Sequence, residues 1–544
     1  MTTSDVPWQP RAVSPGLAED PLRPLSPRAS SAGTSWSLPL RLAWLFDRSS
    51  WAARAAWLVI GASVVRLAII ASTGLSDTES YYYVWSRFLD WSYYDHPPMV
   101  AWLTRLTTLA GASPFTVRIG SVLCAGLFQA LLYRLAARMF SPRAGFVAVA
   151  IVTALPAFLF TSFLANPEAP LAPLWVLYLL LLDDLRRGRE AWRPLVLGLV
   201  IGVAFLAKFT AVLAVPLAVL VVAVSPDLRH WLRRPSFYAG GFVALAVAAP
   251  VIVWNQRHGW PSLALHLVER MPAVTAHSLL TNAGRAAVGQ LLLFHPLVFP
   301  ALLAALAMAF RRAPRDPRYR FLAWTSGPVL LFFFAVMAKA CDAEPHWTMV
   351  GYMPLAVAAA GWLDERLDAP SRALGGYLRV VIAFSAAVGA LYVVHMRSPV
   401  LLRAVPASLY GADADPINET LGWDRVHAAV LASSERLGPD TVVASHHNVL
   451  CGHVAAELGD RPPVYCVSPR RTEFDFLGRR TPPPGAPVVF VESARYPAEP
   501  SAVLEGMRCR RVETIDVERG GVAVGRYRVH ECVPPAPMVI SSVR

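Results

Sequence analysis

The chain has 544 residues, of which 55% are hydrophobic and 16% charged, and its mean hydropathy is +0.43. This composition is too apolar for an ordinary soluble domain. The net charge of +13 does not indicate a nucleic-acid-binding protein, because the arginines form short clusters between apolar runs instead of lining one surface. The apolar runs are mostly about 17 to 25 residues long, which is enough to cross a hydrocarbon layer of roughly 30 Å as a helix.

Residues 1–50 are rich in Pro, Ser and Arg and show no hydrophobic period. Such a segment cannot bury enough apolar surface to offset the cost of ordering it, so we predict a disordered cytoplasmic tail. No apolar segment with a cleavage site lies near its start, so it is not a signal peptide.

Residues 51–398 contain about eleven apolar runs that we predict to span a membrane. They lie near residues 55–73, 115–135, 145–164, 169–182, 194–207, 209–224, 237–253, 288–310, 321–338, 347–363 and 378–394. Residues 194–224 form either one long helix or two short helices that turn at Lys208.

The distribution of arginine favours the turn at Lys208. With it, the basic loops 134–143, 183–193, 225–235, 311–320 and 364–379 share one side with the N-terminus. Roughly 18 Arg and Lys then lie in short inner loops against roughly 7 in outer loops, as the positive-inside rule requires. We therefore expect a cytoplasmic N-terminus and an outer C-terminus, in a bacterial cytoplasmic (inner) membrane.

The composition of residues 415–533 is that of a soluble domain, followed by a short tail at 534–544. Strand-like runs lie at 441–445, 462–468 and 486–493, and residues 423–438 have a helical pattern. We predict a small periplasmic α/β domain. Its four cysteines suit an oxidising compartment, although their pairing cannot be read from sequence: Cys451, Cys466, Cys509 and Cys532.

The outer loop 74–113 contains four acids among many aromatic residues: Asp77, Glu79, Asp90 and Asp95. We expect "YYYVW" and "MVAWL" to form short helices at the membrane interface, where Tyr and Trp concentrate. Partly desolvated acids in such a place gain affinity for protons and suit acid/base chemistry. A purely structural interpretation is that Asp77 caps the helix that starts near Glu79.

Further polar residues are predicted at the outer ends of the spans. Glu168 begins one span, where it either marks a site or only stabilises a helix N-terminus. The only two lysines of the chain, Lys208 and Lys339, map to the same edge. A lysine ammonium suits a phosphate group, but it also serves as a snorkelling anchor.

The segment "SHHNVLCGH" places three histidines and a cysteine close together: His446, His447, Cys451 and His453. Zinc binding is conceivable, but the spacing matches no standard motif. We predict no metal site.

Six motifs in chain order carry a family resemblance: "DTESYYYVWSRFLDWSYYDHPPMVAWL", "FTVRIGSVL", "NPEAPLAPLW", "GVAFLAKFTAVL", "VWNQRHGW" and "EPHWTMVGY". With them, residues 55–395 resemble bacterial membrane glycosyltransferases of the protein O-mannosyltransferase and lipid A aminoarabinose transferase type. The resemblance implies a polytopic helical GT-C-like fold. It also implies an inverting transferase that uses a polyprenyl-phosphate sugar as donor and requires no cofactor.

Carried over by position, the resemblance makes Asp77 the first choice for the general base and Glu168 a supporting acid. Family members commonly have adjacent Asp and Glu before the paired tyrosines, whereas Thr78 separates Asp77 from Glu79 here. The base therefore stays open among Asp77, Glu79 and Asp95. Lys208 and Arg257 are expected at the phosphate. The other predicted substrate-binding residues are Tyr82, His96, Arg118, His258, Lys339, Glu344, His346 and Trp347.

The expected partners are the lipid-linked donor, an unidentified acceptor hydroxyl on a lipid, glycan or protein, and membrane lipids. The main alternative is a transporter or flippase of lipid-linked sugars, for which Arg66 inside the first span is the one supporting residue. A degenerate transferase that only binds its ligand is a third possibility.

Overall fold

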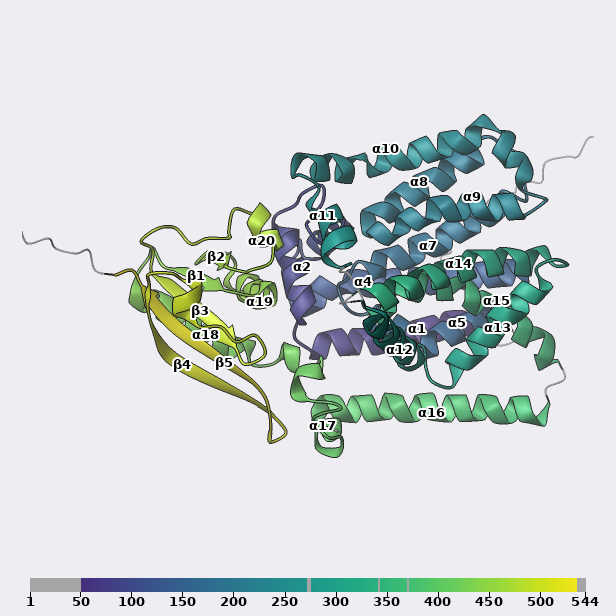
Figure 1. Cartoon of the computed structure of the whole chain (residues 1–544). Helices are drawn as coiled ribbons and strands as arrows, with labels where there is room; N and C mark the ends of the chain where they lie inside the picture. The colour runs from purple at the N-terminus through teal and green to yellow at the C-terminus, as the bar shows by residue number, and fades with distance from the viewer. Residues whose placement is uncertain (1–49, 272–274, 341–342, 369–370, 536–544) are drawn as a thin grey trace, which may run out of the picture.

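The structure is a computed structural model, and it describes residues 50–271, 275–340, 343–368 and 371–535. The predicted tail 1–50, apart from its last residue, and most of the tail 534–544 lie outside the described residues. A helical part and a C-terminal part built on one sheet lie end to end (Figure 1).

Helices lie at all eleven predicted apolar runs, but the predicted number of about eleven membrane spans is not confirmed. The main helices of the helical part are α1 (Trp51–Ser72), α2 (Asp77–Arg87), α3 (Met99–Thr107), α4 (Pro114–Met139), α5 (Pro142–Ala154), α6 (Pro156–Phe160), α7 (Glu168–Asp184), α8 (Trp192–Ala207), α9 (Ala214–Val224), α10 (Pro235–Arg257), α11 (Pro261–Ala264), α12 (Ala276–Leu293), α13 (Val298–Arg312), α14 (Pro317–Lys339), α15 (Met349–Leu367), α16 (Arg372–Arg397) and α17 (Val400–Ala404).

Five described helices are long and apolar enough to cross a membrane, namely α1, α4, α10, α14 and α16. A sixth span results if α12 and α13 are counted as one. The run 288–310 was predicted to be continuous, but the chain bends by 104° between these two helices. The run 145–164 is likewise divided at Pro156, which lacks the N–H that a continuing helix needs. The predicted turn at Lys208 is present, since α8 ends at Ala207 and Lys208 is extended.

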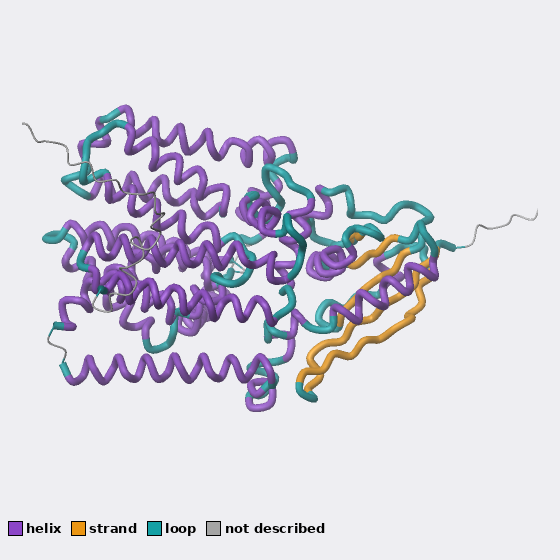
Figure 2. The backbone as a smooth tube through the Cα atoms, turned by 180° about the vertical axis from the view of Figure 1, so that it is seen from behind, coloured by secondary structure: helices purple, strands orange, loops and turns teal. Residues whose placement is uncertain are grey.

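The five basic loops predicted on the inner side meet at one end of the helical part. Ion pairs and hydrogen bonds link them: Arg138–Asp184, Arg143–Asp364, Arg186–Asp227 and Arg186–Pro317. The C-terminal part lies at the opposite end of the helices (Figures 1 and 2). The five basic loops therefore share one end of the helical part, and the C-terminal part lies at the other end.

The C-terminal sheet has the strand order β2-β1-β3-β5-β4. The three predicted strands are present as β1 (Val442–Ser445), β2 (Val464–Cys466) and β3 (Val488–Ser493), which are parallel. An antiparallel hairpin that was not predicted, β4 (Arg508–Arg519) and β5 (Val522–Val533), completes the sheet and is bridged by the disulfide Cys509–Cys532. The helices here are α18 (Trp423–Leu437), α19 (Asn448–Leu458), α20 (Glu473–Phe476) and α21 (Pro500–Val503).

Helix α2 connects the two parts. Its residues Tyr81 and Trp85 belong to the same buried apolar cluster as Val454 of α19 and Phe474 of α20. The main core of the helical part is separate and is formed largely by α4, α5, α7, α8, α14 and α15. The first outer-loop helix is therefore packed as part of the C-terminal core.

Candidate active site

A cavity of about 370 Å³ lies where α8, α10 and α14 approach the C-terminal part. Aromatic and aliphatic side chains form most of its wall, among them Phe205, Phe209, Val251, Phe332 and Phe333. Its polar lining residues are His96, Lys208, Thr210, Asn255, Ser262, His266 and Arg270. An apolar wall with cationic residues at one cavity suits an amphiphile with an anionic head group.

Lys208 reaches this cavity from the break between α8 and the next helical turn. Its buried ammonium forms an ion pair with Oε1 of Glu168, the first residue of α7. Nε2 of His346 lies 2.8 Å from the same oxygen. A carboxylate is favoured at a helix N-terminus, and that of Glu168 also fixes the positions of Lys208 and His346. The structure thus brings together three residues that the sequence predicted separately.

Arg270 and His266 were missed by the sequence analysis. Both line the cavity, together with the predicted Trp347, and the Arg270 guanidinium lies 5.9 Å from the centre of the Trp347 ring. A signal was available, because Arg270 is one of the few arginines on the side that was predicted to be outer and poor in basic residues.

His96 lines the cavity beside Tyr82, with 5.9 Å between the ring centres. Burial, followed by the positive charge of Lys208, lowers the pKa of His96 well below its usual value, so its imidazole is neutral near pH 7. Its Nδ1 atom is buried and has no hydrogen-bond partner among the described residues. A buried polar atom of this kind normally has a partner, which a ligand can supply.

Asp95 precedes His96, and its carboxylate accepts a hydrogen bond from the Tyr81 hydroxyl at 3.1 Å. Burial raises the pKa of Asp95 to about 6, although Arg270 and the Tyr81 hydrogen bond act in the opposite direction. Asp95 and Glu168 both raise the pKa of the Tyr82 hydroxyl and Arg270 lowers it, after the larger effect of burial. Asp95, Glu168 and Arg270 therefore act on one small region.

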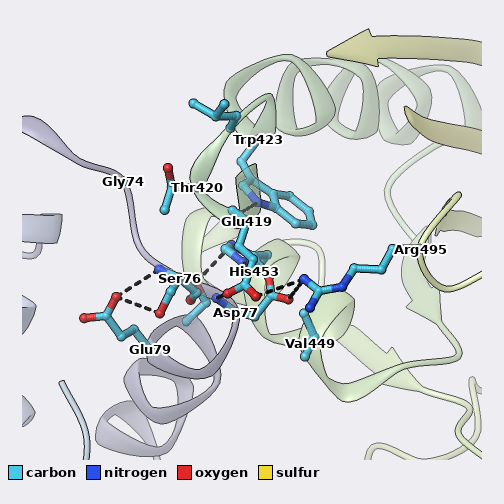
Figure 3. A network of polar contacts seen from close by, with 12 residues as sticks. Gly74, Ser76, Asp77, Glu79, Glu419, Thr420, Trp423, Val449, His453 and Arg495 are labelled. Atoms are coloured by element: carbon cyan, nitrogen blue, oxygen red, sulfur yellow. Dashed lines mark hydrogen bonds and ion pairs between the residues drawn. The ribbon is translucent and has the colours of Figure 1, made fainter. Parts of the chain in front are cut away.

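Asp77 points to the C-terminal part and does not line this cavity (Figure 3). Its two carboxylate oxygens lie 3.0 Å from Nε2 of His453 and 3.0 Å from Nη1 of Arg495. Arg495 also binds Glu419 at 3.0 Å. The expectation that Asp77 caps the helix is wrong, since Ser76 is the N-cap and Asp77 the first helical residue.

Glu79 and Arg118 form a fully enclosed ion pair, with 0% and 2% of their side chains exposed. Glu79 also accepts hydrogen bonds from the backbone N–H of Ser76 at 2.9 Å and of Ala165 at 2.8 Å. Arg118 donates to the carbonyl of Thr73 at 3.0 Å. This pair joins α2 to α4, and neither residue lines the cavity.

Four other predicted residues lie at the surface near helix ends and do not line the cavity: Arg257, His258, Lys339 and Glu344. His258 packs edge-on against Phe476 of α20, with 5.5 Å between the ring centres.

The histidines of the "SHHNVLCGH" segment have other contacts. His453 stacks on Trp423 with 3.9 Å between ring centres, and His447 stacks on Tyr496 at 3.8 Å. Among the described residues, no three His, Cys, Asp or Glu side chains are placed to hold a metal ion.

These features define a multi-pass membrane protein with a largely apolar cavity that is lined by residues of its helical part. The family described as dolichyl-phosphate-mannose-protein mannosyltransferase matches residues 95–254. The lipid A galacturonosyltransferase RgtD of Rhizobium johnstonii (strain DSM 114642 / LMG 32736 / 3841) is 26% identical over 323 residues, which are 56% of this chain and 64% of that protein. The matched region thus spans less than two thirds of the relative.

Two solved structures share the fold, both of ArnT from Cupriavidus metallidurans. The structure bound to undecaprenyl phosphate has a TM-score of 0.60 at 17% identity and covers 87% of this chain and 97% of that one. The apo structure has a TM-score of 0.59 at 18% identity, with the same coverage. The resemblance to membrane glycosyltransferases with a GT-C fold is therefore confirmed.

Proposed function

We propose that this chain is an inverting glycosyltransferase that moves a sugar, a hexose or a pentose, from a polyprenyl-phosphate carrier to an acceptor hydroxyl. The reaction takes place on the outer face of a bacterial cytoplasmic membrane, with the N-terminus cytoplasmic and the C-terminal part periplasmic. The observation that carries the proposal is the cavity in which an apolar wall meets Lys208 and Arg270. The match to a lipid A galacturonosyltransferase favours a glycolipid as the acceptor.

The cavity fits the donor. A polyprenyl chain is apolar and suits the wall of α8, α10 and α14, while its phosphate suits the two cationic side chains. Phosphate is the leaving group, so these charges lie where negative charge develops in the transition state. The donor is already activated, and the proposal requires no metal ion.

Asp95 is our choice for the general base among the three acids left open by the sequence. Glu79 is held by Arg118 and Asp77 by His453 and Arg495. Asp95 directly precedes the cavity-lining His96, although it is not itself a lining residue. A base with a pKa of about 6 is ionised at pH 7 yet still takes up a proton. The hydroxyl oxygen of the acceptor would attack the anomeric carbon while Asp95 takes up the hydroxyl proton. At the same time the bond between the anomeric carbon and the phosphate oxygen would break, and the polyprenyl phosphate would leave.

Glu168 has a supporting role in this scheme. Its carboxylate is paired with Lys208 and His346, which makes it a poor base but a good anchor for the lysine. Of the two partners, Lys208 lines the cavity in which we place the phosphate.

The rival function, transport of the lipid-linked sugar, rested on Arg66 within α1. Arg66 donates to Ser162 at 2.8 Å and to Gln129 at 2.9 Å, so its polar groups are used inside the bundle. A buried charge with these partners needs no transport role.

Purified protein in detergent, supplied with a polyprenyl-phosphate sugar and candidate lipid acceptors, tests the proposal. Transfer without a sealed bilayer excludes obligatory transport. We expect Asp95→Asn to lower the transfer rate at least about 100-fold with unchanged elution in size-exclusion chromatography. Transfer by this variant at the wild-type rate would remove Asp95 as the base. Absence of transfer by the wild type, together with sugar translocation in proteoliposomes, would support the transporter instead.

A further inference from the structure

The short helix α20 extends from the C-terminal part to the proposed base. The peptide N–H of Glu473, its first residue, donates to the Tyr81 hydroxyl oxygen at 2.6 Å, and Tyr81 donates to Oδ2 of Asp95 at 3.1 Å. An N–H group can only donate, so the oxygen of Tyr81 must accept this bond. The single hydroxyl proton of Tyr81 is then free to point at Asp95.

The Glu473 side chain makes a second connection to the same segment. Its Oε2 accepts a hydrogen bond from the backbone N–H of Tyr94 at 2.7 Å, one residue before Asp95. Burial raises the pKa of Glu473 well above its usual value, and Asp95 and Asp90 add to the shift. A glutamine side chain has the same shape and would keep an acceptor oxygen for the Tyr94 N–H.

Aromatic rings surround both connections. Phe474 of α20 stacks on Tyr81 with 6.2 Å between ring centres, and Phe476 stacks on Tyr94 at 5.8 Å. Phe476 also contacts Trp254 of α10 at 5.3 Å. A capping box between Thr472 and Asp475 holds the short helix in shape.

We propose that Tyr81 and Glu473 are positioning residues for Asp95, so that the C-terminal part completes the active site of the transferase. This inference rests on the function proposed above. It gives a structural role to the buried carboxyl group of Glu473, which takes no part in the proposed reaction. It also explains why α2 is packed within the C-terminal core.

The charged and titratable groups that face Asp95 come from four places. Arg270 lowers its pKa and Glu269 raises it, and His266 lies 3.0 Å from its backbone carbonyl. The remaining neighbours are Tyr81 and Tyr82 of α2, Tyr94 and His96 of its own loop, and Glu473 of α20. Of these, Tyr81 donates a side-chain hydrogen bond to the Asp95 carboxylate, and a donated hydrogen bond favours the charged form.

The pH dependence of transfer tests the role of Tyr81. Without the donated hydrogen bond the pKa of Asp95 rises, so Tyr81→Phe should move the acidic limb of the rate profile upward by about one unit. The rate of this variant should then be about tenfold below that of wild type on the acidic limb, and within about threefold of the wild-type rate at pH 8.5. A merely structural role would lower the rate equally at all pH values. Tyr83→Phe on the same helix is the matched control, and its profile should not move.

Replacement of Glu473 tests the second connection. Glu473→Gln keeps an acceptor for the Tyr94 N–H and should transfer within about twofold of wild type, whereas Glu473→Ala should lose about tenfold. The inference is overturned if Tyr81→Phe keeps the wild-type profile, or if Glu473→Ala and Glu473→Gln are equally active. If the wild type transfers and Asp95→Asn does not, such a result refutes the positioning role alone. If the wild type itself fails to transfer, the proposed function fails and the inference with it.

Discussion

The ammonium of Lys208 and the carboxylate of Glu168 form an ion pair that is more than nine-tenths buried. Lys208 lies on the break after α8 and Glu168 at the start of α7, so the pair fixes two helix ends at the cavity. Desolvation of two charges costs free energy unless both are well paired, and removal of one partner leaves the other buried and uncompensated. Such a pair suits a site that binds an anion, because the Lys208 ammonium can donate hydrogen bonds to a bound phosphate as well as to Glu168.

We predict that Lys208→Met abolishes donor binding and lowers the transfer rate at least about 100-fold, because it removes one of the cations proposed for the leaving phosphate. The other lysine of the chain provides a matched control. Lys339 is exposed at the end of α14 and lies outside the cavity lining, so Lys339→Met should be as active as wild type.

A double variant separates phosphate binding from support of the fold. Glu168→Gln combined with Lys208→Met removes the uncompensated charge and should recover thermal stability without recovering transfer. Equal loss of activity in Lys208→Met and Lys339→Met would point to a general effect of charge and contradict the prediction.

The wild-type rate should depend on pH through Asp95. Its raised pKa of about 6 means that the carboxylate form, which the proposed base requires, predominates above that pH and is lost below it. We expect the transfer rate at saturating substrate to fall about tenfold per pH unit well below pH 6. Initial rates between pH 4.5 and 8.5 measure this limb, and a flat profile over that range would exclude a base with this pKa.

Much of the fold follows from hydropathy and charge. Apolar runs located the helices, and arginine clusters predicted which loops share an end, because both signals are local in sequence. The bend at His295 between α12 and α13 was missed, since its positive φ of 71° is held by contacts from α16 such as the hydrogen bond to Ser385. The β4–β5 hairpin was missed although Gly520 and Gly521 mark its turn.

The site was predicted only in part, because hydropathy places a residue at one end of the helices without giving the direction of its side chain. Helical periodicity in α2 would have helped. Residues two apart do not share a face of a helix, so Asp77 faces the C-terminal part while Glu79 faces Arg118 of α4. The acids at 77 and 79 therefore cannot serve one site together. The contacts of Asp77 lie more than 300 residues away, and no local pattern predicts them.

The contacts of Asp77 favour a different prediction from the one drawn from its place in the motif. As the base, Asp77→Asn would abolish transfer in a folded protein. The structure predicts the opposite, because an amide N–H facing His453 or Arg495 weakens docking of the C-terminal part by about 1–3 kcal/mol but leaves the cavity unchanged. We expect Asp77→Asn to keep at least about a third of wild-type transfer per folded molecule and to have a lower Tm. Complete loss of transfer at an unchanged Tm would restore Asp77 as the base.

Gly452 of α19 tests whether the C-terminal part must sit tightly on α2. A Cβ atom at this position would lie 3.0 Å from the backbone N and Cα of Tyr81, so a side chain forces the two helices apart. Overpacking of this kind typically costs 1–3 kcal/mol, and here it also displaces the residue that donates to Asp95.

We therefore predict that Gly452→Val lowers both the Tm and the transfer rate, the latter about tenfold or more, and speeds proteolytic cleavage between α16 and α18. Gly389→Val in α16 is the control, because nothing lies within 4 Å of a Cβ there. A Gly452→Val protein with normal transfer but a lower Tm would mean that the close packing of α19 against α2 affects stability alone. Normal transfer at a normal Tm would mean that the close approach of Gly452 to Tyr81 is not maintained in the membrane.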